Sequence, residues 1–171
     1  MPKNDLPWLR RRVGLEVVRL WRQGVQVFLA GGALGFDTLA AQETLRLQQG
    51  LLPGIRLVLV LPCLEQEKNW PIRDQLAYRE ILRQASDVIY TSGPYTKGCM
   101  FQRDRYMVEK SAHCICYLRP GQVRGGTLYT VNFARRSGLQ VSNLFGRCPA
   151  MQPALPPSAM AALDRPTVST T

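Results

Sequence analysis

A glycine-rich turn, Ala30-Gly31-Gly32-Ala33-Leu34-Gly35-Phe36-Asp37, places the strongest constraint on the fold of this chain. It follows an apolar run at 25–29 and precedes a helical pattern at 38–49. A strand, a glycine turn and a helix in this order bind phosphates in many α/β proteins. Glycine lets the backbone approach a ligand closely, and the first helical turn offers free amides to an anion. The turn therefore predicts an anion site at the end of a strand.

The turn is one residue short of the dinucleotide-binding fingerprint, which also needs an acidic residue about 20 positions further on. The next strand ends with the segment Leu59-Val60-Leu61-Pro62-Cys63, and no acidic residue follows it until Glu65. Ordinary NAD binding is therefore disfavoured. Asp37 lies inside the motif instead, where it either caps the helix or faces a ribose or a metal.

Strand patterns alternate with helical patterns along residues 6–144. This alternation predicts an α/β fold with a mainly parallel sheet of about five strands. The predicted strands span 25–29, 56–61, 87–91, 113–118 and 140–144, and the predicted helices span 6–23, 38–49, 73–85, 102–111 and 127–137.

Composition is typical of one soluble domain. The chain has 171 residues, 46% of them hydrophobic, and its apolar runs are far shorter than the ~20 residues of a membrane span. Five cysteines without paired spacing favour a reducing cytosol, and residues 1–5 do not resemble a signal peptide, so we expect a cytoplasmic protein. We predict a domain at 1–145 and a disordered, proline-rich tail at 146–171.

The formal net charge of +10 comes from 22 basic and 12 acidic residues, and most of the basic ones are arginine. A dispersed excess of this kind is usually a solvated surface, although it leaves nucleic acid open as a partner. Cys63, Cys99 and His113 are candidate zinc ligands, but they lack Cys-x-x-Cys spacing, and we expect no metal. No pattern of residues in the sequence indicates a Ser-His-Asp triad or a pair of catalytic carboxylates.

A second glycine pair follows the predicted strand at 113–118, in the segment Arg124-Gly125-Gly126-Thr127. Thr127 is placed to cap the helix that follows. Ligands of open parallel sheets bind outside the carboxyl ends of the strands, and both glycine turns lie at such ends. Two turns of this type at one rim favour a shared anion site over two unrelated tight turns.

Two larger side chains near this rim have alternative roles. Trp70 either stacks on a base or covers the edge of the core. Arg103, one turn into its predicted helix, either binds a phosphate or is an ordinary surface arginine.

Several motifs together resemble the YpsA-like family of the SLOG superfamily, whose relatives include DprA and the LOG enzymes. The resemblance covers about 6–144. It is carried by the first glycine turn, Leu61-Pro62-Cys63 with Gln66 and Trp70, Tyr78, Tyr95 with Gly98-Cys99-Met100, Arg103-Asp104-Arg105-Tyr106-Met107-Val108, and Gly125-Gly126-Thr127 with Tyr129-Thr130-Val131.

This resemblance implies a Rossmann-like three-layer αβα fold that binds a nucleotide or nucleotide-derived ligand, such as one like ADP-ribose, in a sensor or regulatory role. No separate cofactor is implied. The expected ligand-binding residues are Gly31, Gly32, Gly35, Asp37, Gln66, Trp70, Arg103, Gly125, Gly126 and Thr127.

Two departures from the family pattern affect function. LOG enzymes carry a catalytic glutamate where this chain has Thr130, which favours a non-catalytic role. YpsA-like chains also begin with a strand ending in Thr-Gly-His-Arg, which lies beside the glycine-turn strand. The sequence lacks it, so we expect one edge of 25–29 to be unpaired. We expect either that the start codon is placed too late and upstream codons restore the strand, or that the protein is weakly stable and binds ligand poorly.

Two alternative functions remain open. A hydrolase of nucleotides or N-glycosidic bonds would use Asp37 or Glu65 as acid or base. DprA-like binding of single-stranded DNA would use the arginines with Trp70 and Tyr95. The sequence also leaves open a homo-oligomer.

Overall fold

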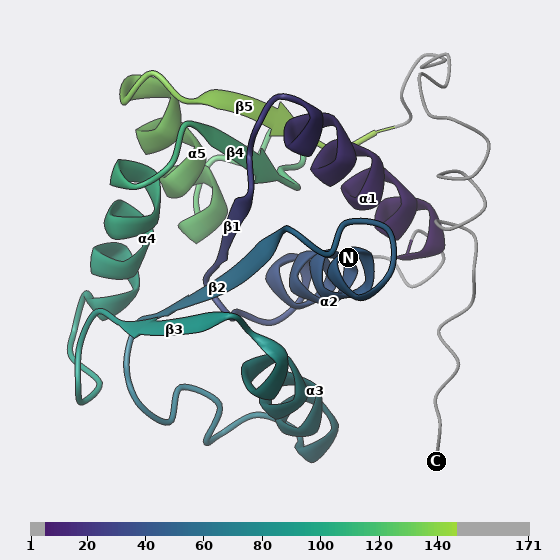
Figure 1. Cartoon of the computed structure of the whole chain (residues 1–171). Coiled ribbons are helices and arrows are strands. Elements are labelled where there is room, and N and C mark those ends of the chain that lie inside the picture. Colours follow the sequence, from purple (N-terminus) through teal and green to yellow (C-terminus); the bar gives the residue numbers. More distant parts are fainter. Residues whose placement is uncertain (1–5, 147–171) are drawn as a thin grey trace.

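The computed structural model describes residues 6–146, in which an initial helix is followed by strands and helices in strict alternation (Figure 1). The predicted tail from residue 147 onward lies outside the described residues. The helices are α1 (Leu6–Arg22), α2 (Phe36–Gln49), α3 (Ile72–Gln84), α4 (Cys99–Glu109) and α5 (Gly126–Arg136). The strands are β1 (Val27–Ala30), β2 (Arg56–Leu61), β3 (Asp87–Tyr90), β4 (His113–Cys116) and β5 (Gln140–Asn143).

All strand pairs in the described residues are parallel, but they form two sheets. One sheet has the order β1-β2-β3, and the other contains β4 and β5. The prediction of a mainly parallel α/β fold is confirmed. The prediction of one sheet of about five strands is wrong, because β1 and β4 lie beside each other without forming a ladder.

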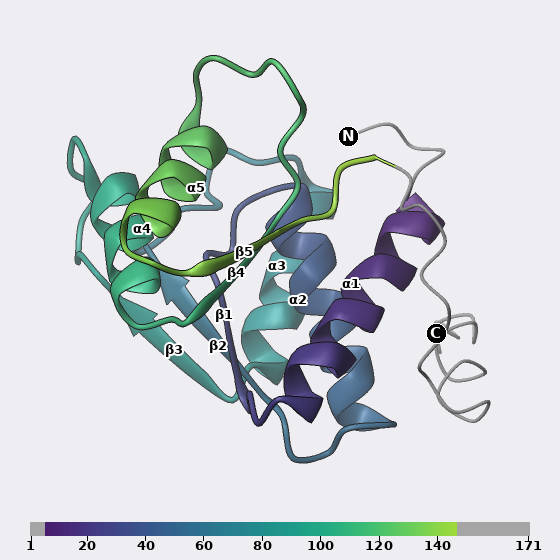
Figure 2. The same ribbon diagram turned by 90° about the horizontal axis from the view of Figure 1, so that it is seen from above.

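The helices cover the sheets in two layers. Helices α1, α2 and α3 pack side by side on one face, while α4 and α5 pack together on the other (Figure 2). Strand β2 lies between β1 and β3, and Leu57 to Leu61 are all buried. This explains its almost continuous apolar sequence, since an inner parallel strand is covered on both faces. The three-layer, Rossmann-like arrangement is confirmed.

Helix α1 follows from its sequence pattern. Leu9, Val13 and Val17 recur at helical spacing, and all three are buried in a core cluster with Leu39 and Leu47 of α2. Among the arginines between them, Arg11 is exposed, whereas Arg10 and Arg12 are half-buried and donate hydrogen bonds to Gln42 of α2 and to the Leu144 carbonyl. Helices α1 and α2 therefore hold each other on the same face of the sheet.

Two helices begin two or more residues earlier than the sequence predicts. Helix α4 begins at Cys99 instead of residue 102, after Gly98 in the left-handed conformation with φ 97°. Helix α2 begins at Phe36 instead of residue 38, so Asp37 is its second residue. Glycine provides the chain reversal at both starts, which shortens the loops at the rim.

Within residues 6–146, none of the helices combines the length and the apolar character needed to cross a bilayer.

Candidate functional site

The first glycine turn connects β1 to α2 at the carboxyl end of the sheet. Gly32 and Gly35 have positive φ angles of 65° and 90°, which favour glycine at both positions. Gly35 is the residue before α2, and no side chain caps the first turn of this helix. The first intrahelical bond runs from the Leu39 amide to the Gly35 carbonyl. The amides ahead of Leu39 thus have no intrahelical acceptor, as an anion site at a helix start requires.

The second glycine turn resembles the first, because a glycine with a positive φ angle again precedes a helix without a side-chain cap. Gly125 has φ 119° and precedes α5, which begins at Gly126 and also has no side-chain cap. The prediction that Thr127 caps this helix is wrong. Thr127 is already the second residue of α5, whereas a capping side chain belongs to the residue before the first helical one.

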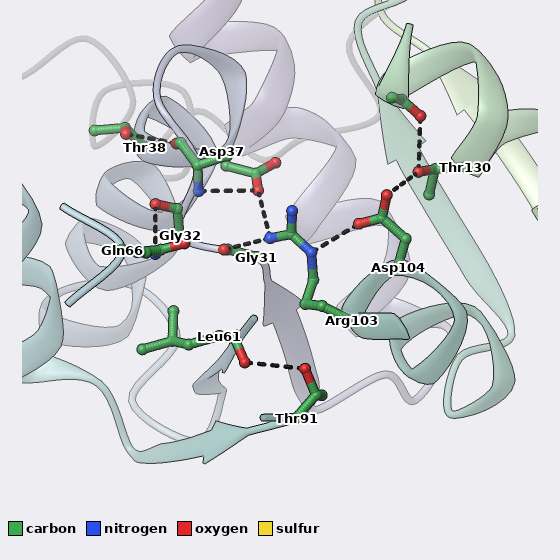
Figure 3. A network of polar contacts seen from close by, with 12 residues as sticks. Gly31, Gly32, Asp37, Thr38, Leu61, Gln66, Thr91, Arg103, Asp104 and Thr130 are labelled. Atoms are coloured by element: carbon green, nitrogen blue, oxygen red, sulfur yellow. Dashed lines mark hydrogen bonds and ion pairs between the residues drawn. The ribbon is translucent and has the colours of Figure 1, made fainter. Parts of the chain in front are cut away.

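A buried arginine of α4 joins the first turn to the other layer of helices (Figure 3). The guanidinium of Arg103 donates a hydrogen bond from Nη1 to the Gly31 carbonyl, and the same nitrogen lies 4.0 Å from Oδ2 of Asp37. Its Nε lies 2.7 Å from Oδ1 of Asp104 in an ion pair. Arg103 is only 7% exposed, so these oxygens replace the water that its charge has lost.

Asp104 continues this chain of contacts to the second turn. The Thr130 hydroxyl lies 2.9 Å from Oδ2 of Asp104 and 3.0 Å from the carbonyl oxygen of Gly126, so its single proton can be donated to either (Figure 3). Polar contacts therefore run without a break from the β1–α2 turn through α4 to the first turn of α5. The two glycine turns are thus connected by one polar network.

Asp37 is the acidic residue closest to the first turn. Its Oδ2 accepts a hydrogen bond of 3.3 Å from the Ala33 amide, which fixes the turn. Burial raises the pKa of Asp37, while the Arg103 guanidinium opposes this rise and the charge of Asp104 adds to it. The alternative that Asp37 caps α2 is wrong, because Asp37 is the second residue of this helix and no side chain caps it. Its observed hydrogen bond stabilises the turn instead.

The loop after β2 packs against the same turn. Gln66 donates a hydrogen bond of 3.2 Å from Nε2 to the Gly32 carbonyl. Trp70 packs edge-on against Tyr78, with ring centroids 5.5 Å apart, and joins the core cluster around β2. Burial raises the pKa of Tyr78 to about 12. Of the two alternatives for Trp70, the contact observed is that with the core edge.

Two cysteines, Cys63 after β2 and Cys99 at the start of α4, are buried at the rim. Burial, followed by the neighbouring Cys99, raises the pKa of the Cys63 thiol, which keeps it protonated and a poor metal ligand. Residues 6–146 contain no group of three or more His, Cys, Asp or Glu side chains positioned to hold a metal ion.

The comparisons with known proteins agree on the family to which the chain is related. The sequence model of YpsA, described as the YspA SLOG family, matches residues 3–140. The chain belongs to this family. It is similar to a UPF0398 protein of Bacillus licheniformis, with 29% identity over 133 residues, which cover 76% of this chain and 71% of that protein.

Two further relatives have comparable similarity. The UPF0398 protein YpsA of Bacillus subtilis is 25% identical over 133 residues, which cover 77% of this chain and 73% of that protein. A UPF0398 protein of Halalkalibacterium halodurans is 30% identical over 111 residues, covering 63% of this chain and 58% of that protein. The match thus spans less than two thirds of the length of the last relative.

The structure brings most of the predicted site residues together. One network contains Gly31, Gly32, Asp37, Gln66 and Arg103, and the contact between Thr130 and the Gly126 carbonyl connects it to the second glycine turn. Trp70 makes no contact in this network.

Sequence reasoning missed the linking role of Asp104. The sequence feature that could have indicated this role is the adjacent pair Arg103-Asp104. Adjacent charged residues on a helix, however, point in different directions and rarely form a buried pair. Only the packing of α4 against α5 shows that Thr130 approaches this aspartate.

Gly32 has a different role from the one its sequence position suggests. A side chain there would be expected to fill phosphate space. In the structure, a Cβ on Gly32 would lie 2.7 Å from Cδ2 of Leu61, 2.8 Å from Nε2 of Gln66 and 3.2 Å from Cε2 of Tyr78. Gly32 is therefore needed for packing of the protein itself.

We expect Gly32→Ala to lower the free energy of unfolding by about 1–3 kcal/mol, because the new methyl group overlaps core side chains at a positive φ. Gly54→Ala is the matched control, since a Cβ there has no heavy atom within 4 Å. Chemical denaturation of both variants measures the difference. Equal stability of the two variants would contradict this account.

We also expect a pH-dependent effect of Asp37→Asn. Because the folded pKa of Asp37 is raised above 3.8, the folded protein binds more protons than the unfolded chain just above this pH, and wild-type stability falls as pH rises there. The uncharged variant does not lose stability in this way, so it gains stability relative to wild type as the pH rises above about 3.8. The slope stays below the single-group limit of about 1.4 kcal/mol per pH unit, since the side chain is 34% exposed. A difference independent of pH would show that Asp37 ionises without penalty.

Proposed function

We propose that the rim formed by the two glycine turns binds a nucleotide or nucleotide-derived ligand, such as one like ADP-ribose, in a sensor or regulatory role. The observation that carries this proposal is the joint placement of two helix starts, at Phe36 and Gly126, which lack side-chain caps and are connected by one polar network. Membership of the SLOG family agrees with this placement.

The chemistry of the turns suits phosphate groups. Amides of the first helical turn donate hydrogen bonds to anionic oxygens, and the helix dipole adds a favourable field. A Cβ built on Gly35 or Gly126 meets no heavy atom within 4 Å, so the space beside both helix starts is open. A ligand with two phosphates, or with a phosphate and a ribose, fits two such starts better than a single small anion does.

Arg103 supports the site indirectly in this proposal. Its guanidinium already contacts the Gly31 carbonyl, Asp37 and Asp104, so it is not the free cation that direct phosphate binding would use. We assign it a positioning role, in which it fixes the first turn relative to α4. Main-chain amides then provide the contacts to phosphate.

The contacts of Thr130 favour binding over catalysis. This residue stands where the related LOG enzymes have a catalytic glutamate, and its hydroxyl is engaged by Asp104 and the Gly126 carbonyl. A neutral hydroxyl cannot act as an ionised base or stabilise a cationic sugar. The remaining candidate is Asp37, whose raised pKa would suit a general acid, and this makes hydrolysis the second function to test.

We expect Gly126→Val to abolish ligand binding without unfolding the protein, because its side chain enters the open space at the start of α5. Thermal-shift titration with AMP, ADP, ATP and ADP-ribose measures this. At a ligand concentration of about 100 Kd, binding stabilises the wild type by roughly 2.7 kcal/mol, and the variant shows no shift. Gly54→Val is the control variant, and we expect ligand to raise its melting temperature as much as that of the wild type. Equal shifts in wild type and Gly126→Val, or no wild-type shift with all four ligands, would refute the proposed site.

We expect the protein to release no adenine from AMP at an enzymatic rate, since Thr130 replaces the carboxylate that such chemistry requires. Chromatography of AMP after incubation with the protein measures free base. Steady turnover that is lost in Asp37→Asn would instead identify a hydrolase with Asp37 as its acid or base.

A further inference from the structure

A groove of about 1100 Å³ lies past the carboxyl ends of β2 and β3. It is bounded by the loop from β2 to α3 and by the loop from β3 to α4, which leave the same end of the sheet (Figure 1). The Leu64 amide of the first loop donates a hydrogen bond of 2.9 Å to the Gly93 carbonyl of the second, so the two walls are joined. A groove of this size is large enough for a small-molecule ligand.

The groove shares a wall with the first glycine turn. Gln66 and Tyr78 line the groove, and the same two side chains pack against Gly32. Gln66 donates a hydrogen bond of 3.2 Å to the Gly32 carbonyl, and a Cβ on Gly32 would lie 3.2 Å from Cε2 of Tyr78. The groove therefore adjoins the turn at which we propose phosphate binding.

Exposed apolar side chains line this groove. Tyr95 is 70% exposed, and its ring stacks on no other aromatic ring of residues 6–146. Leu64, Tyr90 and Met100 are also exposed and also belong to the lining. Large apolar side chains exposed together in one place indicate a contact with a ligand or partner. An exposed tyrosine ring suits a flat aromatic group, which can stack on it.

The charges of the groove disfavour phosphate there. Although the chain has a net charge of +10, the charged residues in the lining are Glu65, Glu67 and Lys68. Lys68 lies 3.6 Å from Glu65 in an ion pair, and Arg79, outside the lining, lies 3.7 Å from Glu67. The lining thus offers carboxylate oxygens, which accept hydrogen bonds, and no unpaired cation. It suits a neutral group that carries N–H donors.

Glu65 has an unusual backbone conformation. Among the described residues, it is the only one other than glycine with a positive φ angle, 55°. Such conformations are uncommon for residues with a side chain, and they cluster at ligand sites. The Glu65 side chain is 73% exposed, so its carboxylate is accessible to a ligand in the groove.

We propose that this groove binds the base of the nucleotide ligand and selects an amino-substituted purine such as adenine. The base stacks on Tyr95, and its exocyclic amino group donates a hydrogen bond to Glu65. Because the phosphate groups of the same ligand occupy the glycine turns, this assignment rests on the proposed function. The stacking role that the sequence left open for Trp70 then belongs to Tyr95.

Calorimetric titration of the 171-residue chain separates the base from the phosphate. The probes are AMP, its base-free counterpart ribose 5-phosphate, and inosine monophosphate, in which an oxygen replaces the amino group. We expect the wild type to bind AMP at least about fivefold more tightly than either of the other two, because each lacks one of the proposed contacts.

Variants assign these contacts to residues. We expect Tyr95→Ala to weaken AMP binding at least about fivefold without changing the affinity for ribose 5-phosphate, whereas Tyr95→Phe keeps the ring and the wild-type affinity. Glu65→Gln reduces the preference for AMP over inosine monophosphate, because its amide can donate to the new oxygen. Phe101→Ala is the matched control, since Phe101 is an aromatic residue that is 50% exposed and lies outside the lining.

The outcomes separate the base subsite from the phosphate site. Equal affinities of the wild type for AMP and ribose 5-phosphate, or an unchanged AMP affinity in Tyr95→Ala, would overturn the base subsite and leave the phosphate site in place. An equal loss in Phe101→Ala would reject the assignment to Tyr95. Equal affinities for AMP and inosine monophosphate would reject the selection of an amino group. If neither AMP nor ADP-ribose binds, the proposed function fails, and the base subsite fails with it.

Discussion

The buried guanidinium of Arg103 holds the rim of this protein together. It ties the Gly31 carbonyl after β1 to Asp37 in α2 and to Asp104 in α4. A charge removed from water is costly unless oxygen atoms surround it, and here three residues from separate segments provide them. The same contacts fix the first glycine turn and, through Asp104 and Thr130, its position relative to the second. The site depends on this arginine even though the arginine makes no ligand contact in our proposal.

This network has a second consequence, because it spans the gap between the two sheets. Gly31 follows β1 on one side, whereas α5 and its Thr130 follow β4 on the other. The network therefore connects the segments that follow the two sheets.

Local sequence patterns predicted most of the fold. The apolar run of β2, the helical spacing of Leu9, Val13 and Val17, and the glycines at the rim placed nearly every element within three residues of its observed bounds. These signals are reliable because burial and backbone conformation act on neighbouring residues. The glycine turns and Arg103 were likewise found as site candidates. The contacts that Arg103 makes could not be predicted from the sequence, since its partners Gly31 and Asp37 are distant in sequence.

The sequence by itself determined the alternation of strands and helices, the two glycine turns and the family of the protein. The tertiary structure decided that the strands form two sheets, that Trp70 covers the core edge, and that Gly32 is glycine because of Leu61, Gln66 and Tyr78. The physical reason is the range of the interactions. Helical periodicity and turn conformation are local, whereas strand pairing, the packing of a methyl group and the burial of a charge depend on residues that only the folded chain brings together.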